Sequence, residues 1–498
     1  MIRRPGLLLL AAVVASGCRR APAPGSASGG LAPRGDAIWL SDPASAGQEG
    51  LEDSLQRMGA AALFLPAGEI VMESGRWAVR EDPRPPRRLD RVPVALVLRA
   101  GPELSGAFRT DVGSDPAAIA RAVGTALHPS LDPSGPYGRV RGVHLDVPFS
   151  PAGAARYAAF VRALRGALPA GTFVSIGIQT PPASDADRKK IAPLLEAANA
   201  IVAFVFRDGE RVEAAAVDSL RRPWWAAFGT AGHGVRSAAD GESPAAVSEK
   251  FLDPLSGSAR IDLGNDLSQN DATISAFHLL ARDPVRLDGL SLDRGDRITF
   301  RLPSQTELLF ELGSVLAGKR YALGRVMLFE GASDAERIFP IAAFEDVLLG
   351  RGLSPALAVT VQPQGRRAVT VEAVNRSAHA SIVSRVSGWV EIDLTPARPA
   401  DVSLGGFDRY EVYDAGGRPV SPGRATRVRL FETLVAPWES IAAARIAVRG
   451  ALPASCCRYR SHWIAAAGPE VATDWSSPPP APTPVPSRTA AKRKRPRA

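Results

Sequence analysis

Several short apolar runs in the first half of the chain end in an acidic residue. The clearest of these runs begins at Gly142 and ends at Asp146. Two carboxylates on opposite sides of a sugar ring, about 5 to 9 Å apart, can hydrolyse a glycosidic bond by acid and base catalysis. Asp146 is the first candidate for such catalysis. The second carboxylate could be Asp208, Glu69 or Asp262.

Each of these acids also has a structural interpretation. Asp146 could form an ion pair with Arg207, and for Asp146 this structural role is weighed equally with catalysis. For Asp208 and Glu69 a structural role is favoured over catalysis. Other polar residues near the same positions could contact a bound ligand without reacting with it. These candidates for substrate binding are Arg207, Gln179, His144 and His233.

The sequence predicts neither a metal site nor a cofactor. His144 alternates with Asp146, so both side chains should point to the same face of a strand. A metal would need a third ligand such as His233, and no local spacing of His, Cys, Asp or Glu is typical of a zinc site. A hydrogen-bonded His144 is therefore favoured over a metal ligand. The chain also lacks the Gly-X-Ser-X-Gly turn of many serine hydrolases.

Alternating strands and helices are expected to position these residues between residues 36 and 275. This alternation is typical of βα units around a parallel sheet that is buried on both faces. The expected strands cover residues 37–40, 61–65, 92–98, 140–146, 172–178, 201–206, 224–228 and 259–263. The expected helices cover residues 48–58, 115–127, 151–168, 185–198 and 212–220. The pattern predicts an α/β fold, a (β/α)₈ TIM-like barrel with its active site at the carboxyl ends of the strands. An open doubly wound sheet is the alternative, but no Gly-rich phosphate loop follows the first strand.

The second half of the chain has a different pattern. Short strands separated by turns predict an α+β region with a β-sandwich over residues 276–450. Residues 451–498 are expected to form a Pro-rich and basic disordered tail. The adjacent Cys456 and Cys457 cannot build a disulfide framework, and two free or loosely oxidised thiols are favoured there over a strained bond between neighbours.

The first eighteen residues resemble a bacterial lipoprotein signal. Arg3 and Arg4 precede a short apolar stretch, and small residues then lead to Cys18. The resemblance implies a signal peptide over residues 1–17, lipid on Cys18 and a flexible tether over residues 18–35. The protein should then be anchored to a membrane of the cell envelope, on the periplasmic face of the outer membrane if there are two membranes. An ordinary secretory signal is the alternative.

The net charge of +9 is concentrated at the two ends of the chain. Arg3, Arg4 and the basic cluster over residues 488–498 account for nearly all of it, so the body of the protein is close to neutral. This distribution argues against a nucleic-acid-binding surface on the body. The basic tail could instead contact anionic envelope polymers, or it could simply be a solubilising tail.

Three segments resemble a family of bacterial envelope lipoproteins of unknown function with a glycosidase-like TIM barrel. They are Asp36-Ala-Ile-Trp-Leu40, Gly142-Val-His-Leu-Asp146 with the helix that follows it, and Val205-Phe-Arg-Asp-Gly209. In that family the middle strand ends in Asp-aromatic-Asp, whereas this chain has Pro148 at the second acid position. Asp208 stands where the family has Met.

The resemblance implies an envelope protein that binds or hydrolyses a polysaccharide such as peptidoglycan. The altered residues at the expected active face favour the alternative, a non-catalytic binding or scaffold lipoprotein with a degenerate barrel.

Overall fold

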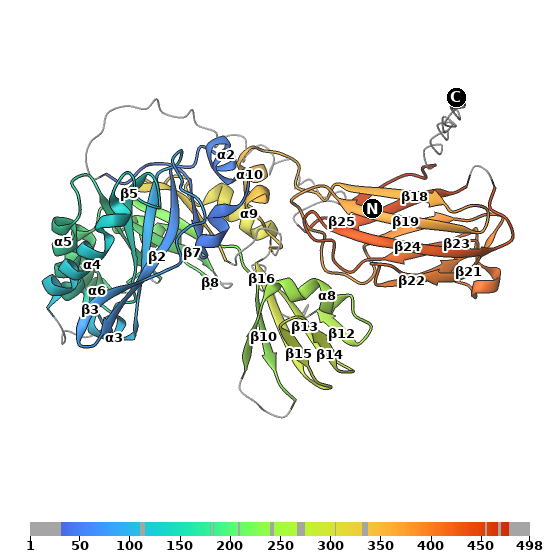
Figure 1. Cartoon of the computed structure of the whole chain (residues 1–498), viewed down its shortest axis with the longest axis horizontal. Helices are drawn as coiled ribbons and strands as arrows, with labels where there is room; N and C mark the ends of the chain where they lie inside the picture. The colour runs from blue at the N-terminus through green and yellow to red at the C-terminus, as the bar shows by residue number, and fades with distance from the viewer. Residues whose placement is uncertain are drawn as a thin grey trace, which may run out of the picture.

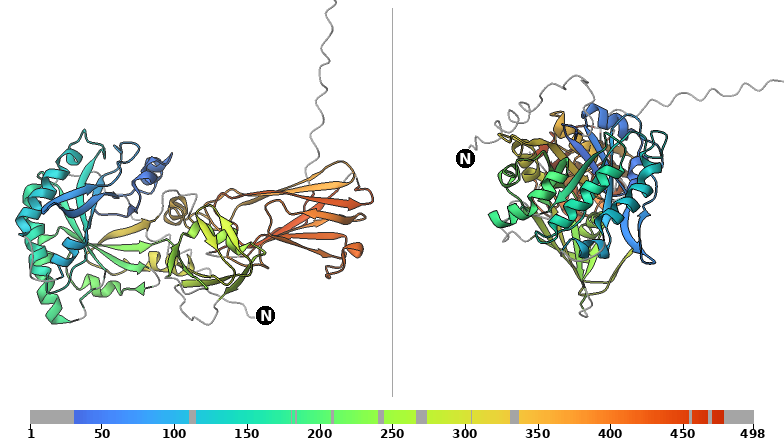
Figure 2. Two further views of the ribbon diagram at one scale, coloured as in Figure 1. Left: turned by 60° about the horizontal axis from the view of Figure 1, so that its bottom comes forward. Right: turned by 90° about the vertical axis from the view of Figure 1, so that its left-hand side faces the viewer.

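The computed structural model describes residues 31–109, 115–179, 181–182, 184–207, 210–239, 244–265, 274–303, 305–330, 337–453, 456–466 and 470–477. Figure 1 shows a barrel at one end of an elongated molecule, a sandwich of two sheets at the other end, and a smaller sheet between them. A second view has the same order of parts (Figure 2). Within the described residues, no helix is long and apolar enough to cross a membrane. The expected signal peptide, Cys18 and most of the tether lie outside the described residues.

Eight parallel strands close the barrel. They are β1 (Ala37–Leu40), β2 (Ala62–Glu73), β4 (Val94–Ala100), β5 (Val140–Asp146), β6 (Phe173–Ile178), β7 (Ala200–Arg207), β9 (Trp224–Gly229) and β17 (Ala322–Phe329). Closure is complete because β1 pairs in parallel with both β2 and β17. The predicted (β/α)₈ barrel is therefore confirmed, and the open doubly wound sheet is excluded.

Helices cover the outside of the barrel. They are α2 (Leu51–Arg57), α3 (Pro102–Ala107), α4 (Pro116–Leu131), α5 (Ala154–Ala167), α6 (Asp185–Ala197), α7 (Ala214–Asp218), α9 (Gln305–Ser314) and α10 (Ile341–Leu348). Asp115 begins α4 by accepting hydrogen bonds from two backbone N–H groups of the first turn, and Pro116 follows it. Shorter elements complete this part: η1 (Pro43–Gly47), β3 (Arg76–Glu81), which extends β2 as a hairpin, and β8 (Glu210–Arg211).

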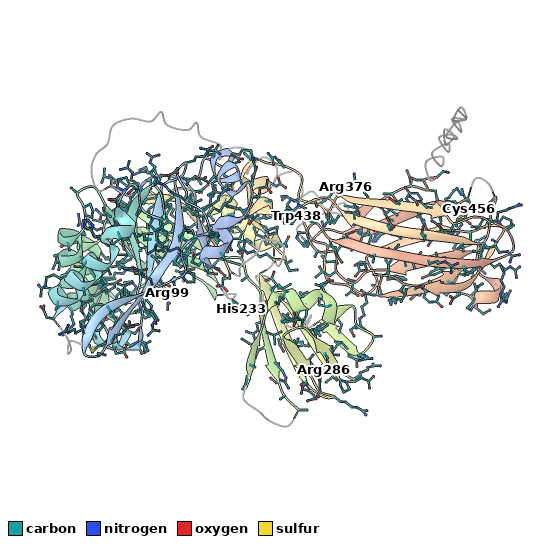
Figure 3. The ribbon with its side chains drawn as sticks, in the orientation of Figure 1. Arg99, His233, Arg286, Arg376, Trp438 and Cys456 are labelled. Atoms are coloured by element: carbon teal, nitrogen blue, oxygen red, sulfur yellow. A yellow bond between two sulfur atoms is a disulfide. The ribbon has the colours of Figure 1, made fainter. Side chains whose placement is uncertain are left out.

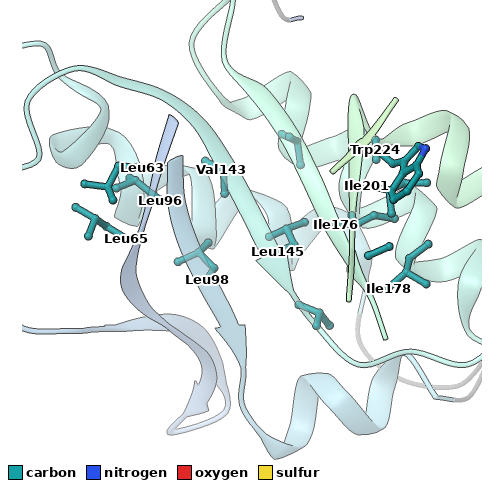
Figure 4. Close-up of a cluster of buried hydrophobic side chains, with 14 of the residues drawn as sticks. Leu63, Leu65, Leu96, Leu98, Val143, Leu145, Ile176, Ile178, Ile201 and Trp224 are labelled. Carbon is teal, nitrogen blue, oxygen red and sulfur yellow. The ribbon is translucent and has the colours of Figure 1, made fainter. Parts of the chain in front are cut away.

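The barrel strands are apolar on both faces because each face meets other side chains. The outward face packs against the helices, as Leu65, Leu98 and Leu145 do in Figure 4. The inward face fills the barrel with a second cluster that includes Trp39, Phe64 and Trp225. Burial on both faces explains why each strand is a continuous apolar run in the sequence. The alternation of side chains between the two faces also determines which residues point into the barrel mouth.

The eighth strand was predicted wrongly. The expected strand at 259–263 is β12 (Ile261–Asn265) of a separate antiparallel sheet, and the eighth barrel strand is β17. The boundary expected at residue 275 consequently falls inside β13 (Ile274–Ala281). A local apolar run does not indicate which sheet the strand will join, because sheet membership depends on pairing with residues far along the chain.

A five-stranded antiparallel sheet is inserted between β9 and β17, and we call it the inserted sheet. It contains β11 (Ala245–Val247), β10 (His233–Ser237), β16 (Arg297–Pro303), β13 and β12, in that spatial order. The hairpin of β14 (Val285–Leu287) and β15 (Leu290–Leu292) and the helical segments η2 (Glu249–Phe251) and α8 (Leu252–Ser256) lie within the same insertion. Its core contains side chains such as Phe300 and Leu279.

The last part is the predicted β-sandwich. One sheet contains β18 (Leu357–Pro363), β19 (Ala368–Asn375), β24 (Ser440–Arg449) and β21 (Arg398–Ser403). The other contains β22 (Arg409–Tyr413), β23 (Arg427–Phe431), β20 (Trp389–Asp393), β25 (Arg458–Ile464) and β26 (Glu470–Ala472), and η4 (Pro422–Arg424) precedes β23. Alternate side chains from the two sheets, such as Val371 and Ile392, meet in one core.

The predicted tail begins later than expected. Residues 458–464 and 470–472 are the strands β25 and β26, so disorder from residue 451 was a wrong prediction. Trp463 is only 1% exposed and packs in the sandwich core, which gives this segment the apolar burial that a disordered tail lacks. Cys456 and Cys457 are joined as a disulfide, not as the two free thiols that the sequence favoured. Residues 478–498, with the basic cluster, lie outside the described residues.

Candidate functional site

A cavity of about 240 Å³ lies at the carboxyl ends of β5 and β6. Asp146 is the last residue of β5, and Gln179 directly follows β6. Arg109 comes from the end of α3, and Phe149 from the loop after β5. The wall is otherwise formed by Val147, Pro148, Pro151, Gly177, Ile178, Pro182 and Ile191. One carboxylate, one guanidinium and one amide thus face a mostly apolar cavity, as in many small-ligand sites.

Strand alternation directs Asp146 into the barrel mouth. His144, two residues earlier, is fully buried inside the barrel against Trp39 and Phe64, with ring centroids 4.9 and 5.5 Å away. Asp146 therefore lies one layer above His144, at the open end. Gly177 keeps the neighbouring position open. A Cβ there would lie 3.4 Å from Asp146 Oδ1 and 3.7 Å from His144 Nε2.

His144 is a neutral, structural histidine at this level of the barrel. Burial lowers its pKa to about 3, so the ring carries no charge at neutral pH. Nδ1 lies 3.0 Å from Ser175 Oγ, while Nε2 is buried without a hydrogen-bond partner among the described residues. His144 does not line the cavity, and it supports the floor beneath Asp146. The hydrogen-bonded histidine that the sequence favoured is confirmed.

Glu69 belongs to a row of alternating charges beside Asp146. In the strand register Glu69 is next to Arg99, and Arg99 is next to Asp146. Adjacent strands are about 4.8 Å apart, so roughly 10 Å separates the Cα atoms of Glu69 and Asp146. Glu69 forms an ion pair with Arg80 at 3.3 Å, and Arg99 forms one with Asp82 at 2.5 Å. The ion pair with Arg80 engages the Glu69 carboxylate and favours its structural interpretation.

The remaining predicted site residues are spread over different places. Arg207 ends β7 at the same end of the barrel, but its side chain and all of Asp208 lie outside the described residues. Asp262 is not at the barrel mouth, because it lies on β12 and forms an ion pair with Arg282. His233 begins β10 and lines a second cavity, away from His144. In Figure 3 His233 and Arg99 lie at the same lower end of the barrel.

The second cavity, of about 280 Å³, brings together residues that the sequence did not single out. It lies where β9 and β17 end, and Glu330 directly follows β17. Glu249, which begins η2 of the same insertion, and Arg337 line the same space. The missed signal is the apolar run that ends at Phe329 and is followed by an acid, which is the same pattern that identified Asp146.

The two carboxylates of this second cavity have different environments. Glu249 Oε1 accepts a hydrogen bond from Ile338 N at 2.5 Å, and its other oxygen accepts one from Gly232 N. Burial outweighs these bonds and raises the pKa of Glu249 to about 7. Arg337 donates to the backbone oxygen of Glu330 at 2.8 Å. One acid that holds a proton near neutral pH therefore shares a cavity with a second carboxylate.

The aromatic residues considered from the sequence are structural. Trp224 and Trp225 are completely buried. Trp224 Nε1 donates to Asp218 Oδ1 at 3.0 Å, and Trp225 Nε1 donates to the backbone oxygen of Gly35 at 3.1 Å. The core interpretation of this pair is confirmed, so it is not a stacking surface for sugars.

No protein-family model matches the sequence, and no curated protein matches it. Among solved structures, the spore cortex-lytic enzyme SleL of Bacillus cereus is similar at 13% identity and a TM-score of 0.40, over 64% of this chain and 74% of that chain. A xylanase-alpha-amylase inhibitor protein in complex with trehalose is similar at 12% identity and a TM-score of 0.33, over 64% of this chain and 99% of that one. A glucosidase from Croceicoccus marinus is similar at 8% identity and a TM-score of 0.32, over 86% and 98%. Likenesses of this size carry no argument about activity.

Proposed function

We propose that the protein is a lipid-anchored envelope protein that binds a polysaccharide in the Asp146 cavity. The observation that carries this proposal is the convergence of Asp146, Arg109 and Gln179 on one cavity at the carboxyl ends of the barrel strands. Localisation rests on the lipoprotein-like signal that ends at Cys18.

The chemistry of the cavity suits a sugar. Sugar hydroxyls both donate and accept hydrogen bonds, and the carboxylate of Asp146, the amide of Gln179 and the guanidinium of Arg109 offer both roles. The ring of Phe149 and the apolar wall can cover the C–H face of a sugar ring. The negative charge of Asp146 and the positive charge of Arg109 cancel in the cavity, which favours a sugar unit without charge.

Binding is better supported than hydrolysis in this cavity. Acid and base catalysis at a glycosidic bond needs two carboxylates. Asp146 is the single carboxylate among the described lining residues, and Glu69 is held in its ion pair with Arg80.

We expect Asp146→Asn to weaken binding of peptidoglycan and exopolysaccharide fragments by about tenfold or more, because hydrogen bonds to a charged group are worth about 1.5–3 kcal/mol. The substitution keeps the size of the side chain, so the barrel should fold normally. Binding is measured on a fragment array and then by calorimetry with the best fragment. Asp185→Asn is the matched control, because that carboxylate is 91% exposed on α6. Equal affinity of both variants for the same fragment would remove Asp146 from the site.

The Glu249 and Glu330 cavity supports a second candidate function, the hydrolysis of a glycosidic bond. A carboxylic acid with a raised pKa, such as Glu249, beside a second carboxylate is the usual arrangement for this reaction. In this scheme Glu249 donates a proton to the leaving oxygen, and Glu330 acts as the base or nucleophile.

For this second candidate we expect the release of reducing ends from peptidoglycan or exopolysaccharide to fall as the pH rises above about 7. The reason is that Glu249 must be protonated to act as an acid, and its pKa is about 7. Glu330→Gln should abolish the release, whereas Glu372→Gln, an exposed carboxylate on β19, should not change it. Release that is unchanged in Glu330→Gln, or that is absent from the unmodified protein on both polymers, contradicts hydrolysis at this cavity and leaves binding as the function.

A further inference from the structure

A cluster of carboxylates lies where the inserted sheet packs against the sandwich. Asp253 is on α8, Glu432 directly follows β23, and Glu439 directly precedes β24. A fourth acid, Asp408, precedes β22 and touches the end of α8, because a Cβ on Gly257 would lie 1.8 Å from Asp408 Oδ1. Figure 1 shows α8 on the side of the inserted sheet that faces the sandwich. The cluster therefore joins two parts of the molecule.

The carboxylates are close enough to share one ion. Asp253, Glu432 and Glu439 each offer one oxygen, and these oxygens lie within 4.8 Å of one another. Calcium binds oxygen ligands at about 2.3–2.6 Å, so two oxygens on opposite sides of the ion are about 5 Å apart. One ion between the three side chains can contact all of them.

Glu432 gives an independent indication of a missing ligand. Only 4% of this residue is exposed, and its Oε2 atom is buried without a hydrogen-bond partner among the described residues. A buried carboxylate oxygen without a partner is unfavourable, and native proteins usually satisfy such atoms. A cation in the cluster would satisfy this oxygen.

The charges of the cluster also favour a bound cation. The carboxylates of Asp253, Asp408, Glu432 and Glu439 lie close together in a mostly buried place, where their negative charges repel one another. A divalent cation would replace this repulsion with attraction.

The neighbouring contacts hold the ligands in place. Glu439 Oε2 accepts a hydrogen bond from Ala436 N at 2.8 Å, which fixes this side chain. Arg385 donates to the backbone oxygens of Ser256 and Ile261 at 3.2 and 2.6 Å, which holds the end of α8 against the sandwich. Asp253 and Ala436 also line a cavity of about 410 Å³, through which an ion can enter.

We propose that Asp253, Glu432 and Glu439 form a calcium site that fastens the inserted sheet to the sandwich. Carboxylate oxygens are the ligands of hard cations, and their irregular arrangement on three separate segments suits Ca²⁺. Mg²⁺ requires a near-octahedral shell and keeps several waters, which a mostly buried cluster does not accommodate.

The test is calorimetric titration of CaCl₂ into full-length protein that has been purified in detergent and stripped with EGTA. We expect one Ca²⁺ to bind per chain, with MgCl₂ binding more weakly. The midpoint of thermal unfolding should rise as the Ca²⁺ concentration rises, because the ion binds only the folded state.

Glu432→Gln should weaken Ca²⁺ binding by about 100-fold or more, since residues that merely support a metal ligand already contribute about 10–100-fold. The midpoint of thermal unfolding of this variant should rise less with added CaCl₂ than that of the unmodified protein, because the variant binds the ion more weakly. Asp253→Asn serves as a second variant on the other side of the site, and Glu372→Gln is the exposed control in the sandwich. Absence of Ca²⁺ binding to the unmodified protein, or equal binding by Glu432→Gln and Glu372→Gln, overturns the proposal. Neither result depends on a bound polysaccharide.

Discussion

Cys18→Ser is expected to move the protein from the membrane fraction to the soluble fraction almost completely. Each methylene group of an acyl chain that is buried in lipid contributes about 0.8 kcal/mol, so several chains on one cysteine hold a protein almost irreversibly. The apolar stretch before Cys18 is too short to span a bilayer. Among the described residues, no helix is long and apolar enough to cross a membrane. The loss of one thiol should therefore remove the main attachment.

The measurement is fractionation of cells by ultracentrifugation, followed by a wash of the membranes in high salt. The wash matters because the basic residues in 488–498 could hold the variant on an anionic surface, and salt screens that attraction. A second variant that combines Cys18→Ser with removal of residues 488–498 isolates the lipid from the tail. Membrane association of this double variant after the wash would refute lipid anchoring through Cys18.

Local patterns in the sequence were sufficient for most of the barrel. Seven of its strands and most of the helices between them, though not α3, could be predicted, because each strand is a short apolar run bounded by turn residues. Asp146 could be assigned to the barrel mouth for the same reason, since alternation along β5 is a local property. The cavity around Asp146 needed the fold, because Arg109 and Gln179 come from loops after other elements.

Long-range pairing was not predictable from these patterns. The apolar run of β17 is as clear as the others, but an inserted sheet separates it from β9 along the chain. The second cavity depends on this pairing, because Glu330 reaches the barrel mouth only when β17 closes the barrel. The acidic cluster depends on long-range packing even more than the second cavity does. Asp253 and Glu432 are far apart in sequence, and only the packing of two separate sheets brings them together.

The buried Glu391 of the sandwich illustrates a charge that no local pattern indicated. It lies on β20 and is completely buried, directly opposite Arg429 of β23 and Arg460 of β25. Its Oε2 atom accepts hydrogen bonds from Arg429 at 2.6 and 3.0 Å, and its Oε1 atom accepts one from Arg460 at 3.0 Å. Arg427 is also within ion-pair distance, at 3.7 Å. A single buried carboxylate thus contacts three guanidinium groups.

Aromatic rings fix these arginines in place. The guanidinium of Arg429 lies 4.2 Å from the ring centroid of Trp389 and 4.5 Å from that of Tyr413. Arg460 lies 4.8 Å from the centroid of Trp475. Because the rings and the sheet hold them, the arginines cannot easily separate if their shared carboxylate is lost. Their positive charges would then repel one another in a partly buried place.

Glu391→Gln is accordingly expected to lower the free energy of unfolding of the sandwich by about 3–5 kcal/mol, the usual cost of removing one partner of a buried ion pair. Urea unfolding followed by the fluorescence of the sandwich tryptophans measures this change. Glu411→Gln on the neighbouring strand β22 is the matched control, since that side chain is 43% exposed and its ion pair with Arg409 should contribute less than about 1 kcal/mol. Adding Arg429→Gln to Glu391→Gln should cost less than Arg429→Gln does alone, because the two side chains act as one unit. Equal unfolding midpoints for Glu391→Gln and Glu411→Gln would mean that the three arginines do not depend on Glu391.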